Sequence, residues 1–333
     1  MHHAHRLPLS VKLAALPVAL ALLIAGLFFS GCQDTVAEVG GPASLQTTQA
    51  LDLLPADAEM IAMVDLASAR KSGAVDRMMG GEMSPFGRDG SDEMDRLIRL
   101  TGFDPAEDVD RIYVAADPAS ESGAMVLYAR FDRQRIERVI ADEAPEEAER
   151  TEIEGVPAWI AREDGEAFAF ALPNDEMMLA GSEAAVRAML TRLSTGAPGA
   201  SSNADLMALV QKARHPETAW AVVRGLQGTG ASGDDPMSQI SGVTESMVTS
   251  FEFRADGMGM DVFVLPRSGA AASDVADLAS GAVSAMRVQA KDEPALMDAL
   301  DGVEVREEAG GVRVTGFMPQ SIFAEARAYG PQR

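Results

Sequence analysis

Residues 54–64 read LPADAEMIAMV, and residues 215–223 read HPETAWAVV. In both stretches a proline is followed by a pair of residues that contains an acid, then by an alanine and an apolar run. Proline and small polar residues mark a turn, and a short apolar run after a turn is typical of a strand. Because this opening occurs twice, we expect the chain to contain two similar halves.

Downstream of each opening, apolar runs of strand length alternate with segments of helical period. In the first half we expect strands at 112–116, 125–129, 157–162, 166–172 and 176–180, and helices at 68–79, 91–100, 132–142 and 182–193. In the second half we expect strands at 248–253, 258–265, 303–305 and 312–314, and helices at 203–213, 272–288 and 319–329. This pattern predicts an α+β fold with an antiparallel sheet in each half and helices on one face, in a duplicated ferredoxin-like arrangement.

Two segments of small and polar residues divide the chain. Residues 194–203, STGAPGASSN, have the composition of a flexible linker, and residues 33–50 contain a Gly-Gly-Pro step and resemble a tether. We therefore expect a first domain at residues 51–196 and a second at residues 203–330, with a tether at residues 32–50.

The first residues have the composition of an export signal. Arg6 and Lys12 precede an apolar run at residues 13–29, and small residues follow it. A basic start, an apolar stretch and small residues before a cleavage site define a secretory signal peptide. The run is short for a membrane-spanning helix and contains Pro17. We expect residues 1–31 to be a signal peptide that is removed on export.

Cys32 directly follows this segment and is the only cysteine of the chain. The sequence Phe29-Ser30-Gly31-Cys32 resembles the lipobox of bacterial lipoproteins, in which Leu is more frequent at the position of Phe29. The resemblance covers residues 1–33. It implies cleavage before Cys32, a diacylglycerol on its sulfur and an acyl chain such as palmitate on its new amino group. Because each buried CH₂ contributes roughly 0.8 kcal/mol, several chains hold a protein firmly on a membrane.

The residues after the cysteine bear on location. In enteric-type bacteria, an aspartate directly after the lipidated cysteine retains a lipoprotein in the inner membrane. Here Gln33 takes that position and Asp34 follows it. The resemblance therefore favours the outer membrane of a Gram-negative host, with the protein facing the periplasm.

The charge of the chain excludes one class of partner. The chain has 28 basic and 51 acidic residues, a formal net charge of −23. Cleavage before Cys32 would remove Arg6 and Lys12 and leave a net charge of −25. Such an acidic chain lacks the basic face that nucleic acids require. Acylation of Cys32 would also leave no free thiol for a disulfide or a nucleophile.

The folded region opens with Leu54-Pro55-Ala56-Asp57 ahead of an apolar run. This opening resembles that of a set of uncharacterised exported bacterial proteins, whose mature regions begin with a Leu-Pro-Ala-Asp segment leading into a strand. The resemblance implies an expectation about the fold and none about an activity.

Catalytic motifs are sparse. His2, His3 and His5 lie in the export signal, so His215 is the one histidine expected in the mature chain. A histidine before a proline is more often a loop residue than a catalytic base. The sequence contains neither a G-x-S-x-G elbow nor a Walker-type phosphate loop. We expect no bound cofactor.

Acidic residues provide the remaining candidates. Asp104, Glu107, Asp108 and Asp110 form a dense short cluster whose oxygen atoms could bind Ca²⁺, but they do not follow the twelve-residue calcium-loop pattern. An acid-rich turn and helix cap is the other interpretation of this cluster. Two carboxylates that face each other across a cleft would permit hydrolysis, which spacing in a sequence does not reveal.

Two functional hypotheses follow. The first is a noncatalytic, lipid-anchored protein of the bacterial envelope that binds a protein partner or an apolar ligand. The alternative is a carboxylate-dependent hydrolase of the cell envelope, which would require acids with raised pKa values in one cleft.

Overall fold

The structure is a computed structural model that describes residues 45–73, 91–117, 122–143, 148–163, 166–215, 218–225, 240, 242–291 and 293–322. The expected signal peptide, Cys32 and most of the expected tether lie outside these residues. No helix within the described ranges is long and apolar enough to cross a membrane. The described chain forms two compact units, which divide between Ala58 and Glu59 and again between Asn203 and Ala204.

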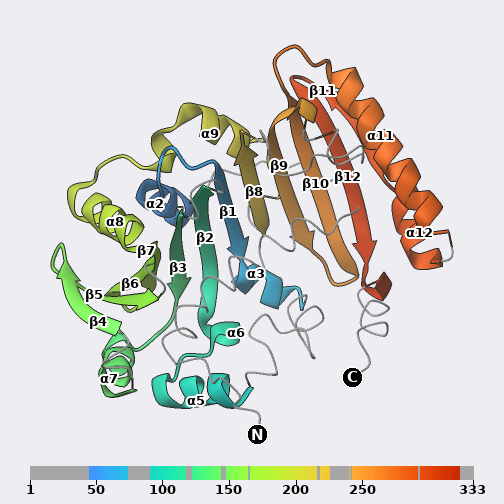
Figure 1. Cartoon of the computed structure of the whole chain (residues 1–333). Helices are drawn as coiled ribbons and strands as arrows, with labels where there is room; N and C mark the ends of the chain where they lie inside the picture. Colours follow the sequence, from blue (N-terminus) through green and yellow to red (C-terminus); the bar gives the residue numbers. More distant parts are fainter. Residues whose placement is uncertain are drawn as a thin grey trace, which may run out of the picture. The chain divides into compact units, whose positions relative to one another are not determined.

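Unit 1 comprises the described residues up to Ala58 and from Ser91 to Asn203. Its strands follow the order β2-β3-β7-β6-β5-β4 and every neighbouring pair is antiparallel (Figure 1). The strands are β2 (Val109–Asp117), β3 (Ser122–Ala129), β4 (Ala148–Ile153), β5 (Val156–Glu163), β6 (Glu166–Asn174) and β7 (Met177–Ser182). The helices are α2 (Leu45–Leu53), α5 (Ser91–Thr101), α6 (Pro105–Asp108), α7 (Arg133–Glu143) and α8 (Glu183–Thr195).

Helix α8 shows why the local sequence sets its bounds. The Ser182 side chain accepts a hydrogen bond from the Ala185 backbone N–H, which satisfies one of the free donors of the first turn. At the other end Gly196 adopts a left-handed conformation with φ of 68°, which a residue without Cβ accepts at little cost. Val186, Met189 and Leu190 face the core, and α8 packs on β3, β6 and β7. The predicted helix over 182–193 is confirmed.

The segment that follows α8 differs from its expected role as a flexible linker. The Ala200 N–H donates to Leu54 O at 2.9 Å, and Asn203 Nδ2 donates to Ala56 O at 2.7 Å. A Cβ on Gly199 would lie 2.1 Å from Asp52 O, so only glycine permits this approach. The segment is therefore packed against the chain at residues 52–56, and its small residues serve close contact.

Unit 2 comprises the described residues from Glu59 to position 73 and from Ala204 onward. Its strands follow the order β11-β12-β10-β9-β8-β1, again with antiparallel neighbours. They are β1 (Met60–Asp65), β8 (Ala219–Arg224), β9 (Thr244–Phe253), β10 (Gly257–Pro266), β11 (Glu304–Glu308) and β12 (Gly311–Pro319). The helices are α3 (Leu66–Lys71), α9 (Ala204–Val210), α11 (Ala272–Gln289) and α12 (Pro294–Asp301).

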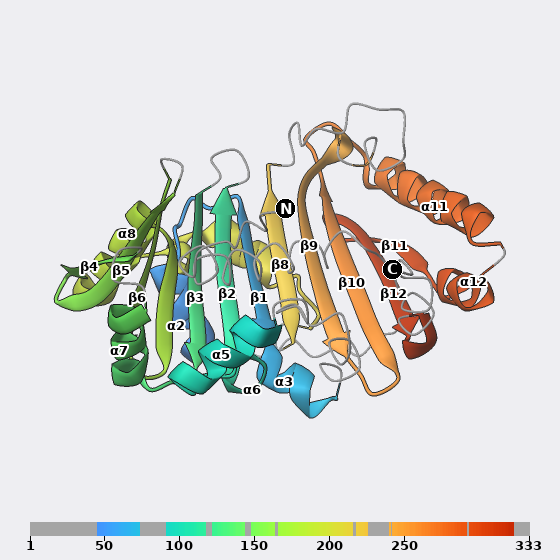
Figure 2. The same cartoon turned by 60° about the horizontal axis from the view of Figure 1, so that its bottom comes forward.

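Two different segments cover the two faces of β10. Val275 of α11 packs with Val264 of β10 and Val312 of β12, and α11 lies alongside this end of the sheet (Figure 2). Because side chains alternate along a strand, Asp261 points away from α11. Residues 211–215, which follow α9, cover that second face, as described below.

Strand β1 pairs with β8 in a register that matches the sequence repeat. If the Leu-Pro-Ala-Asp stretch is aligned on the His-Pro-Glu-Thr stretch, Ile61 corresponds to Val222. In the antiparallel ladder Ile61 pairs with Val222, and Met60 pairs with Val223. Ile61 thus pairs with its own counterpart in the other opening, next to the middle pair of the ladder.

The observed fold is α+β with antiparallel strands, as predicted, but its details differ from the prediction. A split βαβ unit places two parallel strands side by side, whereas every described pair is antiparallel. The expected first domain, 51–196, differs from unit 1, because β1 falls within unit 2, where it pairs with β8. The expected tether ends earlier, since α2 begins at Leu45 and Ala50 is fully buried.

Candidate functional site

A network of buried charges on the second face of the unit 2 sheet is the candidate site. Asp261 of β10 lies opposite Ser250 of β9, and Arg313 of β12 lies opposite Phe263 of β10. Strand pleating places these side chains on the same face as Glu308 at the end of β11. Asp261 is 2% exposed and Arg313 is 6% exposed, so both charges have left water.

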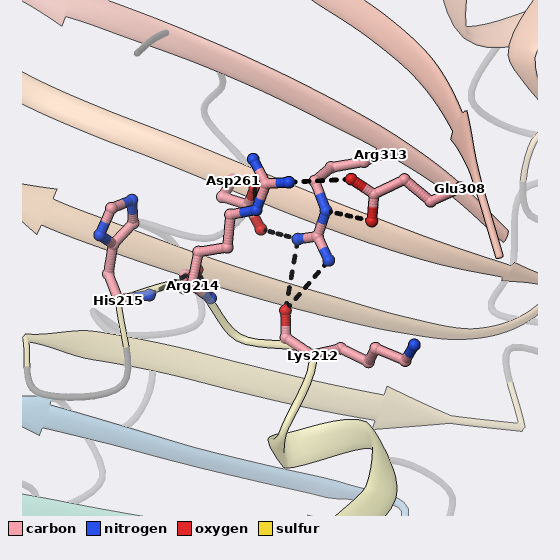
Figure 3. A network of polar contacts seen from close by, with 7 residues as sticks. Lys212, Arg214, His215, Asp261, Glu308 and Arg313 are labelled. Carbon is pink, nitrogen blue, oxygen red and sulfur yellow. Dashed lines mark hydrogen bonds and ion pairs between the residues drawn. The ribbon is translucent and has the colours of Figure 1, made fainter. Parts of the chain in front are cut away.

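Arg313 is the centre of the network (Figure 3). Its Nη1 donates to Asp261 Oδ1, and its Nε donates to Glu308 Oε2 at 2.8 Å. Both of its terminal nitrogens also donate to the Lys212 carbonyl oxygen at 3.3 Å. One guanidinium therefore binds two carboxylates and a backbone carbonyl, which uses most of the five N–H groups of arginine.

Arg214 is the second cation of the network. Its Nη2 donates to Glu308 Oε1 at 2.8 Å, and its Nε lies 3.6 Å from Asp261 Oδ2. Glu308 thus has a hydrogen-bonded guanidinium at each oxygen, whereas Asp261 has one hydrogen bond, at Oδ1. The buried Oδ2 of Asp261 accepts no hydrogen bond.

Residues 211–215, which we call the docking segment, connect α9 to β8 and lie on this face of the sheet (Figure 3). The backbone N–H groups of Arg214 and His215 donate to Ser250 Oγ at 3.1 and 3.4 Å. The Lys212 ammonium lies 5.0 Å from the centre of the Phe263 ring, and the Arg313 guanidinium lies 5.1 Å from it. Polar and cation–π contacts thus hold the segment on β9, β10 and β12.

Burial decides the acidity of Asp261. Loss of water raises the pKa of this carboxyl to about 6, since the charged form is poorly solvated inside the unit. Attraction by Arg313 and Arg214 lowers the pKa, but by less than burial raises it. Repulsion by Glu308 adds to the increase. Asp261 is therefore ionised at neutral pH and takes up a proton in mild acid.

The geometry of the network does not favour hydrolysis by paired carboxylates. Glycosidase carboxylates flank a substrate bond or a water molecule. Here the guanidinium of Arg313 binds both Asp261 and Glu308. Asp261 is also too deeply buried for a substrate to reach in this conformation.

The network is also unsuited to a metal cation. Arg313 binds both carboxylates and Arg214 binds Glu308, so guanidinium groups already take the oxygens that a cation would need. Throughout the part of the chain that the structure describes, no three histidine, cysteine or acidic side chains are arranged to hold a metal ion.

The four acids singled out from the sequence lie at the start of β2 in unit 1. Asp104 Oδ1 accepts from the Ala106 N–H at 2.9 Å and caps α6, and Asp108 Oδ2 accepts from the Asp104 N–H at 2.9 Å. Arg130 pairs with Asp110 at 3.1 Å and approaches Asp108 at 3.6 Å, while its Nη2 donates to the Glu107 carbonyl oxygen. The acids form a helix cap and ion pairs with one arginine, and they do not surround an empty centre.

The remaining candidates from the sequence are Cys32 and the histidines. Cys32 lies outside the described residues, as do His2, His3 and His5. His215 is in the docking segment, where its backbone N–H contacts Ser250.

Sequence reasoning missed the buried network. Asp261 interrupts the apolar alternation of MGMDVFVL at 258–265, and Arg313 does the same in GVRVTG at 311–316. One acid and one base, each inside an apolar strand, are the signal for a buried ion pair, because an unpaired charge there is costly. The signal identifies the two charges but not Glu308 or Arg214, which lie at the end of a strand and in a loop.

Comparisons with known proteins assign no family to this chain. No protein-family model matches the sequence. No curated protein matches it either. Solved structures with some similarity include crystal forms I, III and IV of TP0453, at 8%, 8% and 9% identity and TM-scores of 0.48, 0.49 and 0.48. Each alignment covers 84% of this chain and 96%, 98% and 96% of the respective TP0453 chain. These values are too low to assign a family or a function.

Proposed function

We propose that this chain is a noncatalytic, lipid-anchored protein of the bacterial envelope that binds a protein partner or an apolar ligand. The observation that carries the proposal is Cys32, the sole cysteine, directly after an apolar run and two small residues. Acylation at this position would hold the folded units at a membrane surface. Gln33 after the cysteine favours the outer membrane, with the units in the periplasm.

The composition of the buried network supports a binding role over a catalytic one. Its abnormal carboxyl, Asp261, is inaccessible and bound to Arg313. In some proteins, buried ion pairs with good hydrogen bonds serve to specify one packing arrangement. We interpret the network as part of the framework that positions a binding surface.

The charge of the chain favours a protein partner over an apolar ligand. Within the described ranges, the large apolar side chains that are exposed are Leu193, Met286 and Val288. Single exposed apolar side chains are normal on a protein surface and do not mark a site. The net charge of −25 expected for the mature chain would favour a partner with a basic surface, which charge complementarity would steer toward it.

Lipid labelling tests the anchor. Cells that express the full chain are fed an alkyne analogue of palmitate, and the labelled protein is detected after click chemistry. We expect label on the wild type and on Ser30→Ala, which keeps a small residue before the cleavage site, and none on Cys32→Ala. Label on Cys32→Ala, or an unlabelled wild type, would contradict the anchor.

Crosslinking in native membranes tests the partner. The mature chain would have only Lys71, Lys212 and Lys291 as lysine sites but 51 acidic residues, so a carboxyl-reactive crosslinker samples its surface better than an amine-reactive one. We expect a reproducible partner with the wild type and with Ser30→Ala, and its loss with Cys32→Ala. The absence of any reproducible partner from the wild type would contradict the protein-binding role.

We also propose that the two halves arose by duplication. In the second half the strands follow the order β8-β9-β10-β12-β11. In the first half β1 comes first in the sequence and β2-β3-β7-β6 follow in the matching order, with β4 and β5 as an insertion. A helix follows the third strand of each half, α7 in one and α11 in the other. The self-matching pair of Ile61 and Val222 supports the same repeat. The arrangement in this proposal is a meander with an added hairpin, in place of the ferredoxin-like order predicted from the sequence.

A further inference from the structure

The two carboxylates of the network are not equivalent. Glu308 receives a hydrogen bond at each oxygen, from Arg214 and from Arg313, both at 2.8 Å. Asp261 receives one at Oδ1, and its Oδ2 has no hydrogen-bond donor although the atom is buried. A proton on Asp261 would leave the chain of hydrogen bonds from Arg214 through Glu308 to Arg313 in place. Asp261 can therefore change its charge without breaking the hydrogen bonds of Glu308.

The charged groups around Asp261 come from every element packed against it. Strand β12 contributes Arg313, and the docking segment contributes Lys212 and Arg214 together with the titratable imidazole of His215. Strand β11 contributes Glu308 and, on the same face, the pair of Glu304 and Arg306. Strand β9 contributes the pair of Glu252 and Arg254.

We propose that Asp261 is a proton-operated latch: a proton on its buried carboxylate strengthens the docking of residues 211–215 on β9, β10 and β12. Arg214 of the docking segment lies 3.6 Å from Asp261, and the Lys212 carbonyl binds the same guanidinium that binds Asp261. When the segment lifts, water reaches Asp261. The docked and lifted forms therefore differ in how strongly they disfavour the negative charge on Asp261.

The direction of the effect follows from linkage. Burial raises the pKa of Asp261 to about 6 in the docked form, while access to water returns the pKa toward the ordinary value of 3.8 in the lifted form. The docked form thus binds the proton more tightly, and acidification through pH 6 favours docking. Although Arg214 and Arg313 attract the charged form, their effect is smaller than that of burial. The latch tightens in mild acid and loosens at neutral pH.

Hydrogen exchange of the full-length protein tests the latch. Protection factors, corrected for the intrinsic pH dependence of exchange, are measured by mass spectrometry on the peptide that spans residues 211–215. The backbone N–H groups of Arg214 and His215 are held by Ser250 Oγ, so they report on docking. From pH 7 to pH 5 we expect the wild-type protection factor to rise about tenfold, as a pKa near 6 in one form and near 4 in the other requires.

Two variants and a control assign the effect to Asp261. In Asp261→Asn the rise should disappear, and in Asp277→Asn, which alters an exposed carboxylate of α11, it should remain. In Glu308→Gln the midpoint of the rise should move to lower pH, because the negative charge of Glu308 helps to raise the pKa of Asp261. The Glu308→Gln result also tests the latch if Asp261→Asn does not fold.

Several outcomes would overturn the proposal. These are a wild-type protection factor that falls or stays constant on acidification, an equal rise in Asp261→Asn, or a midpoint in Glu308→Gln that is unchanged or higher.

Discussion

Two groups of acids in this protein have opposite surroundings. The acids at the start of β2, from Asp104 to Asp110, lie close together in sequence, and the Arg130 side chain that pairs with two of them is 60% exposed. Asp261 and Glu308 are far apart in sequence and meet at Arg313, whose side chain is 6% exposed. The first group has conventional surface interactions, and the second has a carboxyl with a raised pKa.

The difference indicates that burial, and not the local density of charge, raises the pKa of an acid in this protein. Water screens closely spaced surface carboxylates and makes their ion pairs weak. A carboxylate inside a sheet loses its hydration and depends on the few cations that reach it, which are Arg313 and Arg214 for Asp261. Substitutions in the two groups should therefore have effects of very different size.

Removal of the central arginine should have the largest effect. Arg313→Met leaves Asp261 buried without its hydrogen-bonded cation, which we expect to lower the free energy of unfolding of unit 2 by about 3–5 kcal/mol. Arg130→Met, the matched change at the exposed group, should lower the stability of unit 1 by less than about 1 kcal/mol. Urea denaturation followed by hydrogen exchange in each unit measures both. Equal losses in the two variants would show that burial does not separate the groups.

The next effect is a pH dependence. The folded-state pKa of Asp261, about 6, is above its ordinary value of 3.8, so the folded form binds the proton more tightly. The free energy of unfolding of the wild type should therefore increase by about 1.4 kcal/mol relative to Asp261→Asn as the pH falls from 7.5 to 5. Denaturation curves of both proteins at the two pH values measure this difference. The same pH response in both proteins, or a relative loss of wild-type stability in acid, would be inconsistent with a raised pKa.

A smaller effect belongs to the helix cap in unit 1. Asp104→Ala removes the acceptor for the Ala106 N–H and should cost about 1 kcal/mol, while Asp104→Asn keeps an acceptor and should cost less. Thermal denaturation of the two variants measures the difference. A calcium-dependent loss in either variant would instead favour the cation-binding interpretation of these acids.

The smallest effect should come from an ion pair at the same place. Asp110→Asn weakens the pair with Arg130 and should change stability by less than about 1 kcal/mol at low salt, with the change shrinking as salt is added. Denaturation at 0.05 M and 0.5 M salt tests this. A large change that persists at high salt would place Asp110 in a less exposed environment than the structure gives it.

Local patterns allowed much of the fold to be predicted. The alternating run at 258–265 became β10, and the helix expected at 272–288 became α11 (Ala272–Gln289). Such elements follow from the period of their own apolar residues. Strand β4 was missed because its sequence, AERTEI, is mostly polar and lies at the end of the strand order, where pairing with β5 alone supports it.

Long-range packing could not be predicted in this way. Small residues at 196–203 suit both a flexible linker and a tightly packed turn, and only contact with residues 52–56 decides between them. Likewise, β1 joins unit 2 through its ladder with β8, whose residues are distant in the sequence. The candidate network depends on the same kind of pairing, since β10, β11 and β12 must align before Asp261 and Glu308 meet Arg313.

The most direct test of the central claim, that burial gives Asp261 its distinct chemistry, is a titration of its carboxyl carbon by NMR in protein labelled at aspartate. The resonance that is absent from Asp261→Asn identifies the residue. We predict that this resonance titrates near pH 6. An inflection near the ordinary value of 3.8 would show that the arginines compensate fully for the lost water, and it would contradict the account.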